Sequence, residues 1–184
     1  MTLANKLTVG RMAALPAIWA FACAPFPHAK VWAALLFTAA AVTDIIDGHT
    51  ARTTHTVSNF GKVFDPIADK LLLLTALLPL LAQDKVPAWM AMVLIAREMM
   101  VSGLRVVLVA QGGEVLAAKW LGKLKTVLQD VAMVLLLLQG ELLWISTLYL
   151  DRIALWLALL FTVVSLVDYF YHARCYFSKN RGQL

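Results

Sequence analysis

Charge is scarce in this sequence. Only 15% of the 184 residues are charged and 61% are hydrophobic, whereas a soluble domain is about 25% charged and about 45 to 50% apolar. A soluble core needs a polar shell, and this chain has too few polar residues to build one around its apolar runs. The composition therefore excludes an ordinary soluble fold and favours an all-α integral membrane protein.

Cysteine is also rare. The two cysteines, Cys23 in an apolar run and Cys175 in a basic tail, offer no disulfide framework and lack the paired spacing of a zinc site. Lys6 and Arg11 precede an apolar stretch, as in a signal peptide, but no clear small-residue cleavage site follows and more hydrophobic segments come after it. We interpret this stretch as a first membrane helix that is retained.

Long apolar runs recur along the whole chain. Crossing the hydrocarbon layer of a bilayer, about 30 Å, takes about 20 helical residues. Six segments have a suitable length: residues 7–26, 30–51, 59–82, 86–110, 118–138 and 144–172. The breakers "APFPH", "AQDKVP", "QGGE" and "QGE" separate several of them. The sequence shows no repeat, and we expect one domain over residues 1–184, a bundle of six transmembrane helices.

The basic residues predict the orientation of this bundle. With both termini on one side of the membrane, that side receives twelve of the sixteen lysines and arginines, whereas the other side receives Lys30, Lys85 and Arg152. The positive-inside rule then places both termini in the cytoplasm. The excess positive charge would face anionic headgroups and anionic substrates, so we expect membrane lipids and no nucleic acid as partners.

Four aspartates interrupt the apolar half of the chain, in "DIIDGHTARTTHTVSNFGKVFDPIADK" from Asp44 to Lys70. Asp44 and Asp47 are spaced i, i+3, and Asp65 and Asp69 are spaced i, i+4, so each pair projects from one face of a helix. Two neighbouring helix ends would present four carboxylates to each other. Because such a cluster near a membrane is strongly self-repelling, a cation must lie within it.

Carboxylate oxygens without cysteine select a hard cation, Mg²⁺ or Mn²⁺. Four of them can hold two ions about 3.5 to 4 Å apart, and such a pair binds phosphate oxygens. The alternative is that the aspartates are unrelated caps and partners of Arg52, Lys62 and Lys70. Gly48 and Gly61 lie beside the aspartates, where each costs about 1 kcal/mol relative to alanine in a helix. They allow either a ligand or another helix to approach the backbone.

This pattern resembles the signature of the CDP-alcohol phosphotransferase family. The matching positions are Asp44, Asp47, Gly48, Ala51, Arg52, Gly61, Asp65 and Asp69. The segments "NKLTVGRMAALP", "IAREMMVSGLR" and "GKLKT" resemble the branch that forms phosphatidylglycerophosphate. The resemblance covers nearly the whole chain and is weakest over residues 139–165 and the last ten residues.

The resemblance implies an enzyme at the inner membrane, with its active site at the cytoplasmic interface. It would transfer the phosphatidyl group of CDP-diacylglycerol to glycerol 3-phosphate, release CMP and act as a homodimer. The implied metal ligands are Asp44, Asp47, Asp65 and Asp69, with Asp69 also the general base. The implied donor-binding residues are Gly48, Ala51, Arg52 and Gly61.

An acceptor that carries a phosphate needs cations of its own. Arg97 and Arg105 are eight residues apart, about two helical turns, and Lys123 and Lys125 begin the fifth helix. Together they indicate a phosphate pocket. Arg97 could instead pair with a helix neighbour or an aspartate of the site, and the lysines could be cytoplasmic anchors.

Three other polar residues are harder to assign. Glu98 is expected to point away from Arg97, since adjacent residues on a helix face different directions. Asp130 could be an interior hydrogen-bonding group, a contact of Lys123 or Lys125, or part of a dimer seam. For Arg11, snorkelling to the interface explains the residue as well as ligand contact does.

Two kinds of alternative function remain. An ion or metal transporter also carries intramembrane charges, but here the acids cluster at one end of two helices and no internal repeat is present. Within the family, inositol phosphate, serine or a phospholipid could replace glycerol 3-phosphate as the acceptor.

Overall fold

The computed structural model describes the backbone of residues 3–54, 59–110, 120–141 and 149–180. Side chains are described for residues 8–44, 66–107, 120–141 and 149–174. Over these residues the chain is helical and contains no strand, which confirms the all-α prediction.

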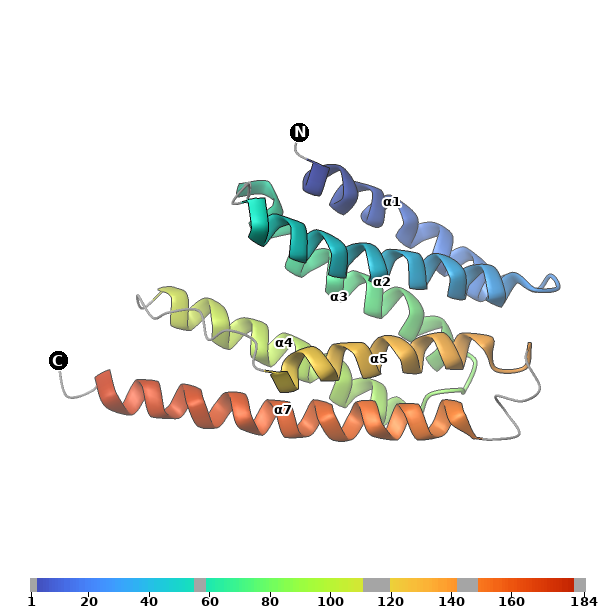
Figure 1. Ribbon diagram of the computed structural model, residues 1–184. Helices are drawn as coiled ribbons and strands as arrows, with labels where there is room; N and C mark the ends of the chain where they lie inside the picture. The colour runs from blue at the N-terminus through green and yellow to red at the C-terminus, as the bar shows by residue number, and fades with distance from the viewer. Residues whose placement is uncertain (1–2, 55–58, 111–119, 142–148, 181–184) are drawn as a thin grey trace.

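The helices form an elongated bundle (Figure 1). They are α1 (Leu3–Cys23), α2 (Ala29–Thr54), α3 (Asn59–Ala82), α4 (Ala88–Ala110), α5 (Trp120–Leu138) and α7 (Leu150–Asn180). The closest packing is between α5 and α7, and α1 packs on both α2 and α3. Helix α5 also contacts α2 and α3, while α4 lies mainly against α7. Helix α5 therefore connects the α1–α3 group with α4 and α7.

The predicted breakers coincide with turns wherever the structure describes them. His28, Asp84 and Gly140 have positive φ angles of 62°, 55° and 91°, and each lies in one of the predicted breaker segments. The fourth breaker, "QGGE", lies outside the described residues. Left-handed backbone at these positions stops a helix and lets the chain reverse direction.

The first and last helices have other bounds than the sequence predicted. The first helix ends at Cys23 instead of residue 26, because Pro25 and Pro27 follow and the residues before a proline avoid helical backbone. The last helix begins at Leu150 and continues to Asn180, eight residues beyond the predicted end. Its start follows Tyr149, whose φ of 52° is left-handed.

One continuous apolar core joins the helices. Its largest fully buried side chains include Ile18 of α1, Phe37 of α2, Leu77 of α3, Leu94 of α4 and Met133 of α5. In lipid such side chains stabilise the bundle through van der Waals packing between the helices, and not through removal from water. A single core over all the helices is consistent with one domain.

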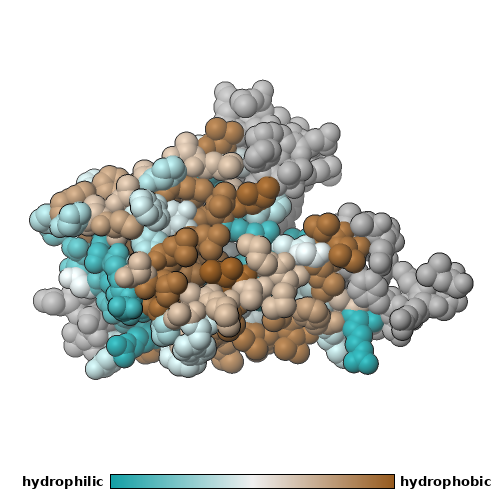
Figure 2. Space-filling model, turned by 180° about the vertical axis from the view of Figure 1, so that it is seen from behind, coloured by the Kyte–Doolittle hydropathy of each residue, from teal (hydrophilic) through white to brown (hydrophobic). Residues whose placement is uncertain are grey.

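The outer surface is also apolar, which is unusual for a protein in water. Large side chains such as Met92, Val106, Leu160 and Val167 are exposed, and Figure 2 shows hydrophobic residues across much of one face. Charged and polar side chains are buried instead, among them Arg11, Arg97, Lys125, Gln129 and Ser165. Apolar residues outside and polar residues inside are the arrangement expected in lipid.

Among the described residues, one helix is long and apolar enough to cross a membrane by itself, Leu150–Arg174 of α7. A shorter apolar helix covers Thr8–Cys23 of α1. Charged residues interrupt the apolar stretches of α4 and α5, where the sequence has "IAREMM" and "GKLKT". The predicted count of six membrane spans therefore stays a prediction.

Polar side chains join the helix ends at the end of the bundle that carries Lys30, Lys85 and Arg152. The Lys85 ammonium donates to the carbonyl oxygens of Leu136 and Gln139, both at 3.0 Å, and so caps the C-terminus of α5. Gln139 donates to the carboxylate of Asp151 in the first turn of α7, at 2.7 Å. These contacts satisfy helix-terminal groups and give this end a structural role.

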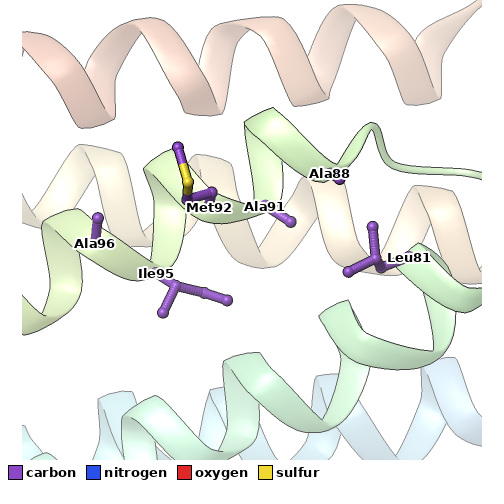
Figure 3. A pocket seen from close by; sticks show the side chains of 6 residues that line it. All are labelled: Leu81, Ala88, Ala91, Met92, Ile95 and Ala96. Atoms are coloured by element: carbon purple, nitrogen blue, oxygen red, sulfur yellow. The ribbon is translucent and has the colours of Figure 1, made fainter.

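An apolar groove lies between the end of α3 and the first half of α4. It has a volume of about 370 Å³, and Figure 3 shows its lining side chains. They are Leu81, Ala88, Ala91, Met92, Ile95 and Ala96. The lining contains no polar side chain, so a charged headgroup has nothing to bind there.

Candidate active site

Asp44 and Asp69 occupy equivalent places on two neighbouring helices. Asp44 lies ten residues before Thr54, the end of α2, and Asp69 lies ten residues after Asn59, the start of α3. At 1.5 Å per residue, each is about 15 Å from its helix end. Because the chain reverses direction between the two helices, equal distances place these aspartates at the same level. They therefore lie in the halves of α2 and α3 that lead to the connection between these two helices, about ten residues from the helix ends.

Arg11 of α1 lies between these two carboxylates. Its guanidinium Nη1 donates to Asp44 Oδ1 and, at 3.0 Å, to Asp69 Oδ1. The Arg11 side chain is 1% exposed, whereas those of Asp44 and Asp69 are 37% and 52% exposed. The snorkelling interpretation of Arg11 was therefore wrong, because its charge is inside the bundle. Arg11 joins α1, α2 and α3 through one cationic group.

This contact tests whether the aspartates fit a metal ion. Carboxylates from two helices converge on one cation and remain partly accessible, which is the arrangement a hard divalent ion requires. Asp47 is on α2 and Asp65 is on α3, as predicted, but their side chains lie outside the described residues. The described side chains alone include no group of three metal-binding residues. The two described aspartates fit a cation, and the four-carboxylate site stays a prediction.

The predicted donor-binding residues flank the aspartates on the same helices. Gly48, Ala51 and Arg52 belong to the last turns of α2, and Gly61 to the first turn of α3. Their side-chain surroundings lie outside the described residues. All four positions are helical, and their role in binding the donor stays a prediction.

A second charged cluster joins α4, α5 and α7. Glu98 Oε1 accepts from Lys125 Nζ of α5 and, at 3.3 Å, from Nη1 of its neighbour Arg97. Nη2 of Arg97 donates to the Ser165 hydroxyl of α7 at 2.9 Å. Lys125, Arg97 and Ser165 are all buried. The cluster thus fixes two buried cations at one position in the bundle.

Glu98 was misjudged from the sequence. It was expected to point away from Arg97, yet its carboxylate contacts both Arg97 and Lys125. The pairing of Arg97 with a helix neighbour, one of the open alternatives, is confirmed. The signal that could have identified Glu98 is electrostatic: two cations at membrane depth need a carboxylate, and Glu98 lies beside one of them.

Arg105 and Lys123 differ in their surroundings. The Nε of Arg105 is buried and has no hydrogen-bond partner within the described structure, although the residue is partly exposed. The Lys123 side chain is exposed. Of the four residues predicted to bind the acceptor phosphate, Arg97 and Lys125 are together in one cluster, and Lys123 is on the surface.

Asp130 of α5 connects the two clusters electrostatically. Its carboxylate is attracted by Lys125 and repelled by Asp44 and by Glu98. Of the three alternatives for Asp130, an interaction with a nearby lysine is therefore supported. Asp130 thus lies within electrostatic range of both the aspartate pair and the cationic cluster.

Comparison with known proteins gives a consistent assignment. The profile of the CDP-alcohol phosphatidyltransferase family matches residues 1–164. A Bacillus subtilis protein named CDP-diacylglycerol–glycerol-3-phosphate 3-phosphatidyltransferase is 44% identical over 180 residues, covering 91% of this chain and 93% of that protein. A Rickettsia typhi protein of the same name is 39% identical, covering 95% of this chain and 98% of that protein.

A relative with a different name is more distant. A Streptomyces coelicolor protein named cardiolipin synthase (CMP-forming) is 33% identical over 151 residues, covering 80% of this chain and 70% of that protein. The profile match and these identities, together with the aspartates on α2 and α3, lead to one conclusion: the chain belongs to the CDP-alcohol phosphatidyltransferase family.

Proposed function

We propose that this protein is a CDP-diacylglycerol–glycerol-3-phosphate 3-phosphatidyltransferase. It transfers the phosphatidyl group of CDP-diacylglycerol to glycerol 3-phosphate and releases CMP. Relatives that are 38 to 44% identical over most of the chain carry this name. The structural observation that carries the proposal is the meeting of Asp44 and Asp69 around one cationic group, in a bundle that also holds a buried cationic cluster.

The acidic cluster is proposed to hold divalent metal, on which the family generally depends. The ligands would be Asp44, Asp47, Asp65 and Asp69, and the ions Mg²⁺ or Mn²⁺, two in number. When bound, they would neutralise the pyrophosphate oxygens and stabilise the departing CMP. The hard carboxylate donors and the partial exposure of Asp44 and Asp69 support this assignment.

Asp69 is proposed as the general base. Its carboxylate is half-exposed and is oriented by the hydrogen bond from Arg11. A carboxylate held in this way can take the proton of the acceptor hydroxyl as that oxygen attacks phosphorus. Gly48, Ala51 and Gly61 would let the cytidine approach the backbone, and Arg52 would bind a donor phosphate.

The acceptor phosphate is proposed to bind at Arg97, Arg105, Lys123 and Lys125. Burial of Arg97 and Lys125 supports this, since ion pairing is strongest away from water. Inositol is uncharged, and the carboxylate of serine is offset by its ammonium group, so neither acceptor offers these cations a net negative charge. The cationic cluster thus favours an acceptor with a phosphate, and the relatives' name specifies glycerol 3-phosphate among such acceptors.

The proposed membrane topology has six spans, with both termini and the active site on the cytoplasmic side. It is supported by the distribution of lysine and arginine and by the family's membrane location. We also propose that residues 1–184 form one domain and that the protein is a homodimer, as the family resemblance implies. Light scattering on the detergent-solubilised protein, corrected for bound detergent, tests the dimer.

A panel of acceptors tests the proposed reaction. Purified protein in detergent, with Mg²⁺ and CDP-diacylglycerol, should release CMP when glycerol 3-phosphate is added. Serine, inositol, inositol phosphate and phosphatidylglycerol are the comparison acceptors. CMP release with phosphatidylglycerol but not with glycerol 3-phosphate would reject the proposal and would indicate a cardiolipin synthase, the name of the Streptomyces relative. CMP release with serine alone would also reject the proposal.

A further inference from the structure

We propose that Glu98 is a positioning residue of the acceptor site. Its carboxylate holds the Lys125 ammonium and the Arg97 guanidinium where both reach the phosphate of the acceptor. The proposal rests on the proposed function, because it assigns a role in binding glycerol 3-phosphate. Glu98 itself repels a phosphate and acts only through its two partners.

The contacts of Glu98 place it at the centre of the cluster. One carboxylate oxygen accepts from Lys125 of α5 and from Arg97 of α4. The side chains of Glu98, Lys125 and Arg97 are 18%, 4% and 10% exposed. Charges that are this far from water interact more strongly than surface pairs do. The position of the Lys125 ammonium is therefore set by α4 as well as by its own helix.

The hydrogen-bond donors of the cluster are not all used. A lysine ammonium has three N–H donors, and the ion pair with Glu98 uses one of them. Arg97 gives Nη1 to Glu98 and Nη2 to Ser165, but its Nε is buried without a partner in the described structure. The buried Nε of Arg105 is also without a partner there. Buried donors without acceptors are rare and indicate a missing acceptor group.

The charges of the cluster fit a phosphate monoester. Arg97 and Lys125 together exceed Glu98 by one positive charge, so these three side chains are net cationic. A phosphate monoester carries about two negative charges at neutral pH. Without Glu98 the cluster would carry more positive charge, but no carboxylate would hold Lys125 and Arg97 in place. The two buried cations would then repel each other.

Asp130 determines what happens when Glu98 is removed. It also interacts with Lys125, more weakly than Glu98 does. Once Glu98 is gone, we expect the ammonium to turn toward Asp130, the other carboxylate that interacts with it, on its own helix. Lys125 would then be held away from Arg97, and the two cations would no longer converge on one phosphate.

Steady-state CMP release by the full-length protein in detergent tests this role. Glu98→Ala should raise the KM for glycerol 3-phosphate about tenfold or more, as expected for loss of a buried charged contact. The KM for CDP-diacylglycerol should stay within about twofold, because the donor residues are on α2 and α3. Glu98→Gln should show a smaller rise, since its amide oxygen still accepts from Lys125.

The matched control is Glu141→Ala at the other end of the bundle. Glu141 also pairs with a basic side chain, His28, and is 22% exposed, close to the value for Glu98. Its removal should leave both KM values unchanged. If Glu98→Ala is poorly folded, the comparison of Glu98→Gln with the wild type decides the question, because glutamine keeps the packing.

Three results would overturn the inference. The first is an unchanged KM for glycerol 3-phosphate in the folded Glu98 variants, and the second is an equal rise of both KM values, which indicates a purely structural role. Both leave the proposed function intact. The third is a wild-type protein that releases no CMP with glycerol 3-phosphate, which rejects the proposed function and this inference with it.

Discussion

The guanidinium of Arg11 on α1 lies 3.0 Å from the carboxylate of Asp69 on α3, inside the bundle. The same Nη1 also donates to Asp44 on α2. One buried cation thus neutralises carboxylates from two other helices, at the proposed metal site. This relationship makes Arg11 part of the electrostatic balance of the site, and it leads to the first prediction.

Arg11→Met should destabilise the protein most when divalent metal is absent. Removing the cation leaves two carboxylates facing each other, at a cost of about 1 to 3 kcal/mol for partly exposed partners. Saturating Mg²⁺ should recover much of the lost stability because the ion can neutralise the same oxygens. Thermal unfolding in detergent, with and without Mg²⁺, measures the difference.

Arg152→Met is the control for this change, since Arg152 lies over the ring of Tyr149 at the other end of the bundle. Its effect should not depend on Mg²⁺. An Arg11 variant whose loss of stability is the same with and without Mg²⁺ would separate Arg11 from the metal site.

Asp69→Asn should reduce turnover by about a hundredfold or more, the usual effect of losing a general base. The amide keeps the shape of the side chain but cannot take a proton. Binding of CDP-diacylglycerol should largely persist because the other donor residues are unchanged. CMP release and donor binding, measured on the same preparation, check this, and normal turnover would remove Asp69 from the role.

Lys125→Ala should raise the KM for glycerol 3-phosphate more than Lys123→Ala does. Lys125 is buried and paired with Glu98, whereas Lys123 is exposed and its charge is screened by solvent. The two lysines are two residues apart on one helix, so each variant controls for the other. Equal effects would mean that burial of Lys125 does not determine acceptor binding.

Lys85 should make stability depend on pH at the other end of the bundle. Burial, with Lys30 nearby, lowers the pKa of Lys85 from 10.5 to about 8. Between these two pH values the unfolded chain binds more protons than the folded protein, so this group makes folding more favourable as pH rises. The difference in melting temperature between wild type and Lys85→Met should therefore shift in favour of the wild type from pH 8 to pH 10. A constant difference would show that Lys85 has an ordinary pKa.

Much of the fold could be predicted from local sequence patterns. Apolar runs of membrane length and the breakers around His28, Asp84 and Gly140 located the helices, because both signals act within a few residues. The exact ends of α1 and α7 were missed. They depend on the backbone conformation of single residues, such as Tyr149.

The site was predicted in part, for a physical reason. The spacing of Asp44, Asp47, Asp65 and Asp69 is visible in the sequence, and it identified the helices that carry the carboxylates. The contacts of Arg11 and Glu98 are between helices far apart in the chain, and no local pattern encodes them. The need of a buried cation for a partner was the available signal, but it does not say which partner is chosen.

Metal removal tests the central claim most directly. CMP release from CDP-diacylglycerol on addition of glycerol 3-phosphate is measured on the purified protein before exhaustive chelation, after it, and after Mg²⁺ is restored. The account predicts that chelation abolishes CMP release and that Mg²⁺ restores it, because Asp44 and Asp69 act through a bound cation. A rate that is undiminished after chelation would contradict it.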